Sequence, residues 1–275
     1  MSARVLTNGE IALLKGKVTY HEIPGPVARR FFLYRASTER RGAPLVVSVH
    51  GIARNAAAHT YRLIEEAERY GLTILAPLFE KELYGQYQQL LDEGTGVRAD
   101  LALLDMLQAA RRLSQADTDR ILLFGFSGGA QFSHRFVFAH PTLVGSAVHV
   151  SAGWYTFPDQ ETRYPRGLRL GSPSLKFDMG QAFGVPQHVM VGEQDLERDS
   201  SLRQSARLDE LQGRTRVERA RRWVAAMGMA SPKGEVPSLQ LLPGVAHSFV
   251  DAVEIGALPS RMFERFVKDV SLASV

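Results

Sequence analysis

Residues 121–129 read Ile-Leu-Leu-Phe-Gly-Phe-Ser-Gly-Gly, and this segment is the most informative in the chain about its fold. Its first four residues are apolar and predict a buried strand, and residues 129–139 predict a helix directly after it. Gly125, Ser127 and Gly129 match the pattern G-x-S-x-G, which between a strand and a helix holds a serine on a tight, strained turn with its hydroxyl above the sheet. Glycine on either side removes the Cβ atoms that would clash in such a bend. The pattern therefore makes Ser127 a candidate nucleophile.

His247 and Asp195 are the residues best placed to activate this serine. A serine hydroxyl is a weak nucleophile and needs a nearby base, most often histidine, which a carboxylate orients and stabilises. His247 lies in a loop rich in glycine and proline after a predicted strand, and Asp195 ends the stretch Val-Met-Val-Gly-Glu-Gln-Asp, where a strand runs into a loop. Glu193 and Asp199 are the neighbouring alternatives for the acid. Where the G-x-S-x-G turn carries a nucleophilic serine, the acid comes next along the chain and the histidine comes last. Ser127, Asp195 and His247 have this order.

Two backbone amides are candidates for holding the negative charge of a tetrahedral intermediate, which needs donors directed at its oxygen. One is the amide of Gly128, directly after the serine. The second is assigned to Ile52, with Ala53 as the alternative, in the loop after a predicted strand at residues 45–50. His50, at the end of that strand, is interpreted as a brace for this loop rather than as a base.

Strands and helices alternate along most of the chain, which predicts an α/β fold with a mostly parallel sheet and helices on both faces. A hairpin at residues 17–23 and 28–36 precedes the alternation. The expected strands are 45–50, 72–76, 120–125, 145–151, 187–191 and 238–242, and the expected helices are 56–70, 98–113, 129–139, 217–229 and 257–270. No linker divides the chain, so residues 1–275 are expected to form one domain. Residues 78–96 and 153–184 interrupt the alternation as small cap insertions at the carboxyl edge of the sheet, where such sheets bind ligands.

Composition argues against several classes of function. The 33 Lys and Arg residues are interspersed among 29 Asp and Glu residues, with a formal net charge of +4, and form no basic tail or stripe of the kind that binds nucleic acid. The densest basic stretch, residues 214–222, is interpreted as the solvated face of a helix rather than as an anion site. The chain has no cysteine, no apolar leader within residues 1–20 and no stretch long enough to cross a membrane. The sequence therefore predicts a cytoplasmic protein with no membrane partner.

The motifs together resemble the α/β-hydrolase superfamily over about residues 30–270. The resemblance is carried by His50-Gly51, the Gly-Phe-Ser-Gly-Gly turn, the acid loop Gly-Glu-Gln-Asp that ends at Asp195, and the His247 loop. Arg54-Asn55 after His50-Gly51 makes the chain similar to the esterase and polyhydroxyalkanoate-depolymerase-like branch, which includes feruloyl-esterase-like members.

This resemblance implies the α/β-hydrolase fold and a two-step acyl transfer on a small-molecule ester. Ser127 would attack the carbonyl while His247 takes its proton, Gly128 and Ile52 would hold the oxyanion, and water would hydrolyse the acyl-enzyme. The resemblance implies no metal and no cofactor.

Aromatic residues in the two insertions are candidates for a substrate pocket. Tyr84 and Tyr87 lie in the first insertion, and Trp154 and Tyr155 lie in the second. Aromatic walls would suit an aromatic or acyl ester of modest size. The simpler alternative is that these rings pack the insertions down.

Two other functions stay open at this point. One is a peptidase or amidase with the same triad, which would need a site for a protonated amine or an extended peptide, and no acidic pair is evident in the cap. The other is a catalytically silent binding protein on the same fold, which would be expected to lack part of the triad. A metal-dependent hydrolase is less well supported because the sequence lacks H-E-x-x-H. The sequence does not predict the oligomeric state.

Overall fold

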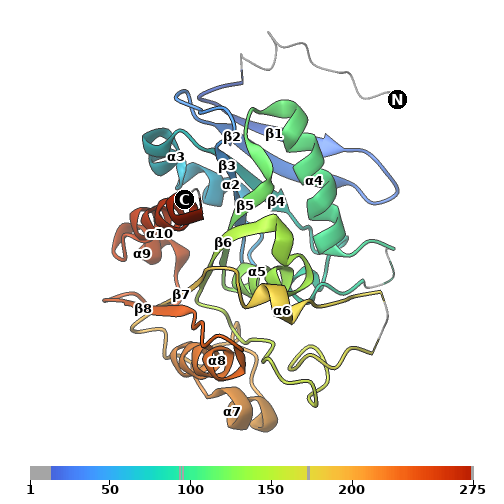
Figure 1. Ribbon diagram of the computed structural model, residues 1–275, viewed down its shortest axis with the longest axis vertical. Coiled ribbons are helices and arrows are strands. Elements are labelled where there is room, and N and C mark those ends of the chain that lie inside the picture. The colour runs from blue at the N-terminus through green and yellow to red at the C-terminus, as the bar shows by residue number, and fades with distance from the viewer. Residues whose placement is uncertain (1–13, 93, 95, 172–173, 274–275) are drawn as a thin grey trace.

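An eight-stranded sheet with the order β1-β2-β4-β3-β5-β6-β7-β8 runs through the centre of the computed structural model (Figure 1). The structure describes residues 14–92, 94, 96–171 and 174–273, so most of the segment on which the expected absence of a leader depends lies outside the described residues. The strands are β1 (Val18–Ile23), β2 (Arg29–Arg35), β3 (Pro44–Val49), β4 (Thr73–Leu78), β5 (Asp117–Phe126), β6 (Val144–Val150), β7 (Gln187–Gly192) and β8 (Ser238–Leu242). β2 pairs antiparallel with β1 and β4, and every other pairing in the sheet is parallel. The predicted hairpin and mostly parallel sheet are confirmed.

Helices cover both faces of the sheet (Figure 1). The helices are α2 (Ala56–Tyr61), α3 (Ile64–Tyr70), α4 (Ala99–Leu113), α5 (Gly128–Ala139), α6 (Met179–Ala182), α7 (Ala206–Gln212), α8 (Arg216–Ala230), α9 (Phe249–Glu254) and α10 (Leu258–Ala273), with 3-10 turns η1 (Tyr87–Gln89) and η2 (Pro141–Leu143). One apolar core contains side chains of α4, α5 and α8, and a second contains side chains of α3, α9 and α10. Within the described residues, no helix is long and apolar enough to cross a bilayer.

β5 shows why the sequences of the central strands are nearly continuous runs of apolar residues. Ile121 and Leu123 lie in the core beneath α4 and α5, whereas Leu122 and Phe124 lie in the core on the opposite face. Successive side chains of a strand point to opposite faces, so a strand covered on both sides needs apolar residues at every position. β5 is thus a central strand of the sheet, with an apolar core on each of its two faces.

The single helix predicted over residues 56–70 is wrong: the structure has two helices, α2 and α3, separated at Arg62 and Leu63. Leu63 is wholly buried in the core beside α3, and its amide bonds to the Thr60 carbonyl, which tightens the chain there. The predicted end of the helical segment at Gly71 is confirmed, because Gly71 has φ 65°, the left-handed conformation that glycine adopts at little cost.

The two insertions meet above the carboxyl edge of the sheet. Residues 78–96 contain η1, and residues 153–184 contain α6. The Tyr164 hydroxyl donates to the Gln89 carbonyl, which joins the second insertion to the first. Arg135 of α5 donates to the Gln88 carbonyl over 2.5 Å and ties the first insertion to the sheet layer. The insertions are therefore packed parts of the domain around the end of β5.

Candidate active site

Ser127 occupies the sharp turn between β5 and α5. Its backbone has φ 55° and ψ −111°, a conformation that a residue with a side chain rarely adopts. The Ser127 amide donates to the Val150 carbonyl of β6 over 2.8 Å, which anchors the turn to the neighbouring strand. The strain and the anchor together place the serine side chain at the carboxyl edge of the sheet.

The glycines on either side of the turn are required by backbone contact. A Cβ added at Gly125 would lie 2.1 Å from the Gly129 carbonyl oxygen, and one at Gly129 would lie 2.0 Å from the Val49 carbonyl oxygen. Both contacts are to main chain, which has no rotamer with which to yield. Helix α5 and strand β3 therefore touch directly at Gly129.

Gly129→Ala should reduce the free energy of unfolding by about 3 kcal/mol or more, since overpacking against backbone forces the helix and strand apart. Gly145→Ala is the matched control, because a Cβ there would lie 3.6 Å from the Ile121 carbonyl oxygen, an ordinary contact. Urea unfolding of the two variants checks the expectation. Equal stability of both variants would contradict the backbone contact at Gly129.

Ser127, His247 and Asp195 form a continuous hydrogen-bonded chain. Ser127 Oγ lies 3.1 Å from His247 Nε2, and His247 Nδ1 lies 2.8 Å from Asp195 Oδ2. Because a carboxylate only accepts, Nδ1 carries the proton and Nε2 is left to accept from the serine. The Phe126 ring stacks on the imidazole, with ring centroids 5.4 Å apart, and limits its rotation. The three predicted triad residues are thus brought together in the order that proton transfer needs.

Neither alternative acid takes the place of Asp195 in this geometry. The Asp195 carboxyl is buried, and one of its oxygens faces the imidazole. Glu193 is exposed, and Asp199 accepts from the Ser201 amide and hydroxyl over 2.8 and 2.7 Å. Asp195 is therefore the carboxylate that orients His247.

The loop after β3 brings Ile52 beside Gly128. A Cβ added at Gly128 would lie 3.3 Å from the Ile52 nitrogen, and one at Gly51 would lie 3.4 Å from the Ser127 Cβ. The Arg54 amide donates to the Gly51 carbonyl over 3.0 Å, so Ile52 stands at the corner of a turn. The backbones of the two predicted oxyanion donors are adjacent and border the serine.

His50 braces this loop, as the sequence predicts. Its Nδ1 lies 2.8 Å from the Gly51 carbonyl oxygen, and its Nε2 accepts from the Phe79 amide over 3.0 Å. Burial lowers the pKa of His50 to about 4, so the ring is neutral and can donate at one nitrogen while accepting at the other. Arg54 adds a second brace, since its guanidinium donates to the Phe79 carbonyl. No pattern in the sequence indicates this role for Arg54.

The four aromatic residues predicted to form pocket walls are all packed inside. Tyr155 is wholly buried and stacks on Trp223, with centroids 4.8 Å apart, and Tyr84 is 4% exposed. Trp154 is 5% exposed, with guanidinium groups over its ring. The Tyr87 hydroxyl donates to the His50 carbonyl over 2.8 Å. Their burial agrees with the alternative that these rings pack the insertions down, and contact of the rings with substrate stays a prediction.

Tyr87 has a position that the sequence did not reveal. A Cβ added at Gly128 would lie 2.6 Å from the Tyr87 hydroxyl oxygen, so the Tyr87 side chain reaches the turn that carries Ser127. Tyr87 therefore connects the first insertion to both loops of the proposed oxyanion site.

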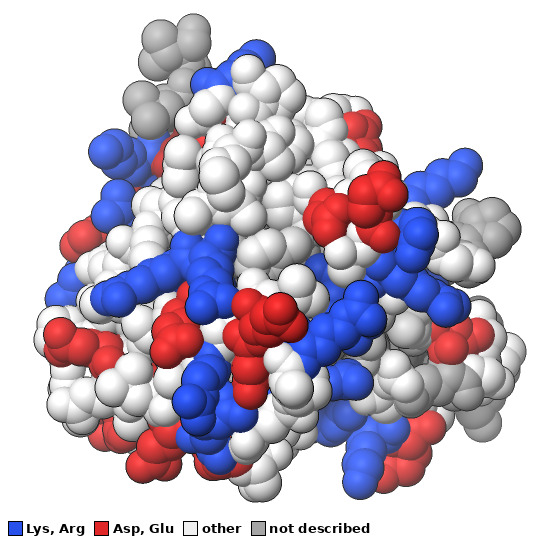
Figure 2. All heavy atoms as spheres, turned by 90° about the horizontal axis from the view of Figure 1, so that it is seen from below, with Lys and Arg blue, Asp and Glu red and all other residues white. Residues whose placement is uncertain are grey.

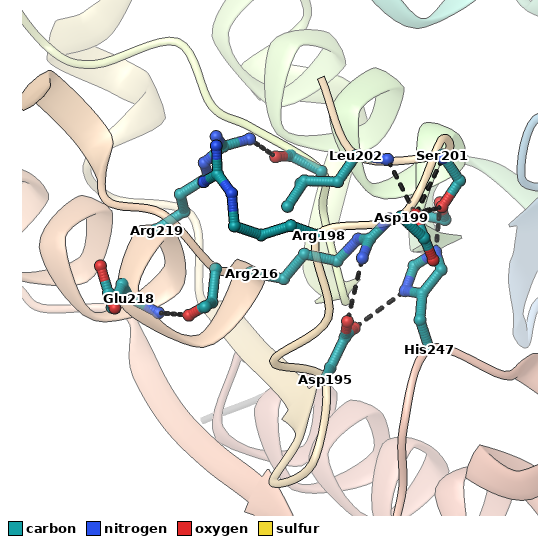
Figure 3. Close-up of polar contacts among 12 residues, drawn as sticks. Asp195, Arg198, Asp199, Ser201, Leu202, Arg216, Glu218, Arg219 and His247 are labelled. Atoms are coloured by element: carbon teal, nitrogen blue, oxygen red, sulfur yellow. Dashed lines mark hydrogen bonds and ion pairs between the residues drawn. The ribbon is translucent and has the colours of Figure 1, made fainter. Parts of the chain in front are cut away.

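The interpretation of residues 214–222 as a solvated helix face is wrong for two of its arginines. The side chains of Arg216 and Arg219 are 0% exposed. Arg216 Nη1 lies 3.1 Å from Asp195 Oδ1 (Figure 3). Arg219 Nη2 lies 2.9 Å from Asp209 Oδ1. Carboxylate partners make this burial possible, because a buried charge needs a counter-charge and hydrogen bonds. Helical spacing alone cannot show which face of α8 has such partners.

Other kinds of site find less support among the described residues. Basic and acidic side chains are interspersed over the face in Figure 2, without a stripe of one sign. No group of three or more His, Cys, Asp or Glu in the described part of the chain could hold a metal ion. A cavity of about 560 Å³ between the insertions is bordered by Arg98, Arg163 and Tyr164, and the residues that line it include no member of the triad.

Solved structures supply the similarities to known proteins. No protein-family model and no curated protein sequence matches the chain. Poly(aspartic acid) hydrolase-1 from Sphingomonas sp. KT-1 is similar with a TM-score of 0.77 and 22% identity, over 90% of this chain and 98% of its own. A poly(3-hydroxybutyrate) depolymerase from Bordetella parapertussis has a TM-score of 0.73 and 26% identity, over 94% and 98%. A ferulic acid esterase has a TM-score of 0.60 and 15% identity, over 90% and 99%.

Proposed function

On the α/β-hydrolase fold, which this chain has, we propose that the protein is a serine hydrolase that cleaves a carboxylic ester. The predicted resemblance to the esterase and polyhydroxyalkanoate-depolymerase-like branch is supported by the similarity to the poly(3-hydroxybutyrate) depolymerase structure. The observation that carries the proposal is the chain of contacts from Ser127 through His247 to Asp195, at 3.1 and 2.8 Å.

The first half-reaction would transfer the acyl group to Ser127. Its Oγ forms a bond to the ester carbonyl carbon while the hydroxyl proton moves to His247 Nε2, and the carbonyl oxygen becomes an oxyanion. Asp195 stabilises the imidazolium, and the amides of Gly128 and Ile52 are the donors proposed for the oxyanion. The bond from the carbonyl carbon to the alcohol oxygen then breaks, and that oxygen takes the proton from His247.

The second half-reaction would return the enzyme to its starting state. Water gives a proton to His247 Nε2 and attacks the acyl carbon, and the resulting intermediate expels Ser127 Oγ, which recovers the proton. The products are a carboxylic acid and the free serine. The residues of this chain suffice for both steps, which is the basis for proposing no cofactor.

A fluorophosphonate probe and a panel of nitrophenyl esters test the proposal. The probe should attach to Ser127, because only an activated serine reacts quickly, and mass spectrometry of the labelled peptide locates it. Short and medium acyl esters should be cleaved faster than the matching anilides. Ester cleavage no faster than that by a Ser127→Ala variant would contradict esterase activity, and preferential anilide cleavage would favour an amidase.

A further inference from the structure

The Arg216 side chain binds the oxygen of Asp195 that His247 leaves free. Arg216 Nη1 lies 3.1 Å from Oδ1, while His247 Nδ1 lies 2.8 Å from Oδ2 (Figure 3). The side chains of Arg216 and Asp195 are both 0% exposed. A donor on each oxygen leaves the carboxylate little freedom to rotate, and charge-assisted hydrogen bonds of this kind are short and directional.

Arg216 is itself held in place on its other side. Its Nη2 donates to the Ser201 hydroxyl over 2.6 Å and lies 3.5 Å from Asp199 Oδ1. Arg216 is the first residue of α8, whose preceding residue, Thr215, caps the helix by accepting from the Glu218 amide. The guanidinium is therefore anchored to a helix and to the loop after Asp195, so it can act as a stationary support.

We propose that Arg216 is a positioning residue of the triad, which holds the Asp195 carboxylate in the orientation that directs His247 toward Ser127. The inference rests on the proposed function, since it assigns a role within the same site. A purely structural link between α8 and the loop is the competing explanation. Positioning acts through Asp195, whereas a structural link acts through folding, and this difference can be measured.

Arg219 provides a matched control on the same helix. Its side chain is equally buried, and its guanidinium pairs with Asp209 over 2.9 Å. It also donates to the carbonyls of Gly213, over 2.8 Å, and Gly153, over 2.6 Å. These partners lie outside the triad. Replacing Arg219 therefore removes a buried, paired guanidinium from α8 without removing a contact to Asp195.

The test measures the rate of fluorophosphonate attachment to Ser127 in Arg216→Met and Arg219→Met proteins that thermal unfolding shows to be folded. Arg216→Met should react about 100-fold more slowly than wild type, because misplacement of a catalytic group by about 1 Å has a cost of this size. The loss in ester hydrolysis should fall on kcat, with KM changed by less than about threefold. Arg219→Met should stay within about threefold of wild type. Equal slowing of the two variants would overturn the proposal.

An Asp195→Ala background separates positioning from folding. Because Arg216 is proposed to act through Asp195, Arg216→Met should cause no further slowing once Asp195 is gone. The same slowing in both backgrounds would overturn the proposal. If Arg216→Met does not fold, Arg216→Lys replaces it, since an ammonium cannot span Asp195 and Ser201 together. If Arg216→Lys slows fluorophosphonate attachment only when Asp195 is present, the positioning role is supported. If it causes no slowing, or equal slowing in the Asp195→Ala background, the role is contradicted.

Proton NMR distinguishes failure of this inference from failure of the proposed function. The downfield resonance of the hydrogen bond between His247 and Asp195 should be present in wild type and Arg219→Met and absent in Arg216→Met. If the three proteins show this pattern but the fluorophosphonate does not label Ser127 in wild type, the esterase proposal fails while the positioning role stands. If wild type is labelled and the resonance survives in Arg216→Met, only the positioning role fails.

Discussion

Ser127→Ala should lower kcat for ester hydrolysis by about four to six orders of magnitude, because removal of the nucleophile leaves only binding and the oxyanion donors to accelerate the reaction. The fold should persist, since the anchoring bond of this turn comes from the Ser127 amide to the Val150 carbonyl and not from the hydroxyl. Steady-state kinetics on the best ester of the panel measures the loss, and circular dichroism confirms the fold.

Ser133→Ala is the matched control for that experiment. Ser133 Oγ lies 2.7 Å from His149 Nδ1, so a second serine–histidine pair joins α5 to β6. The Nε2 of His149 faces the Gln187 amide oxygen at 3.1 Å rather than a carboxylate, and both Ser133 and His149 are wholly buried. We expect kcat to change by less than about threefold in this variant. Retention of full activity by Ser127→Ala would remove Ser127 from the mechanism.

Asp195→Asn should lower kcat by about 10⁴-fold at neutral pH. An amide group can donate to His247 Nδ1, which favours the tautomer with the proton on Nε2 and leaves no acceptor for the serine proton. Glu193→Gln removes an exposed carboxylate two residues earlier and should have little effect. A loss in Glu193→Gln as large as that in Asp195→Asn would mean that the acid has been assigned to the wrong residue. Initial rates under saturating ester decide between them.

The sheet and the meeting of Ser127, Asp195 and His247 could be predicted because local sequence places each of them. An apolar run followed by Gly-Phe-Ser-Gly-Gly specifies both a buried strand and the turn at its end, and the tight turn itself requires Gly125, whose added Cβ would meet the Gly129 carbonyl. Asp195 and His247 follow strands in the same way. Since parallel strands end at a common edge, sequence order alone places their loops together.

The surroundings of the triad could not be predicted because they depend on which surfaces meet. Arg216 and Arg219 lie in a strongly basic stretch that suggests a solvated face. In the structure both are buried, because they form ion pairs with Asp195 and Asp209. Trp154 and Tyr155 follow a strand at the catalytic edge, a place that suits a pocket, but Tyr155 stacks on Trp223 of α8, about seventy residues away. Pairings over such sequence distances leave no periodic signal in either segment.

The absence of a side chain at Gly129 has a consequence for engineering this protein. Main chain meets main chain where α5 passes β3, so the turn of Ser127 is held directly against the end of β3, and the buried His50 side chain braces the loop of Ile52 that follows. The exposed Ile52 side chain, at 53%, projects from that rigid frame. Libraries that vary exposed positions such as this one can therefore search for new substrates while the reacting geometry stays constant.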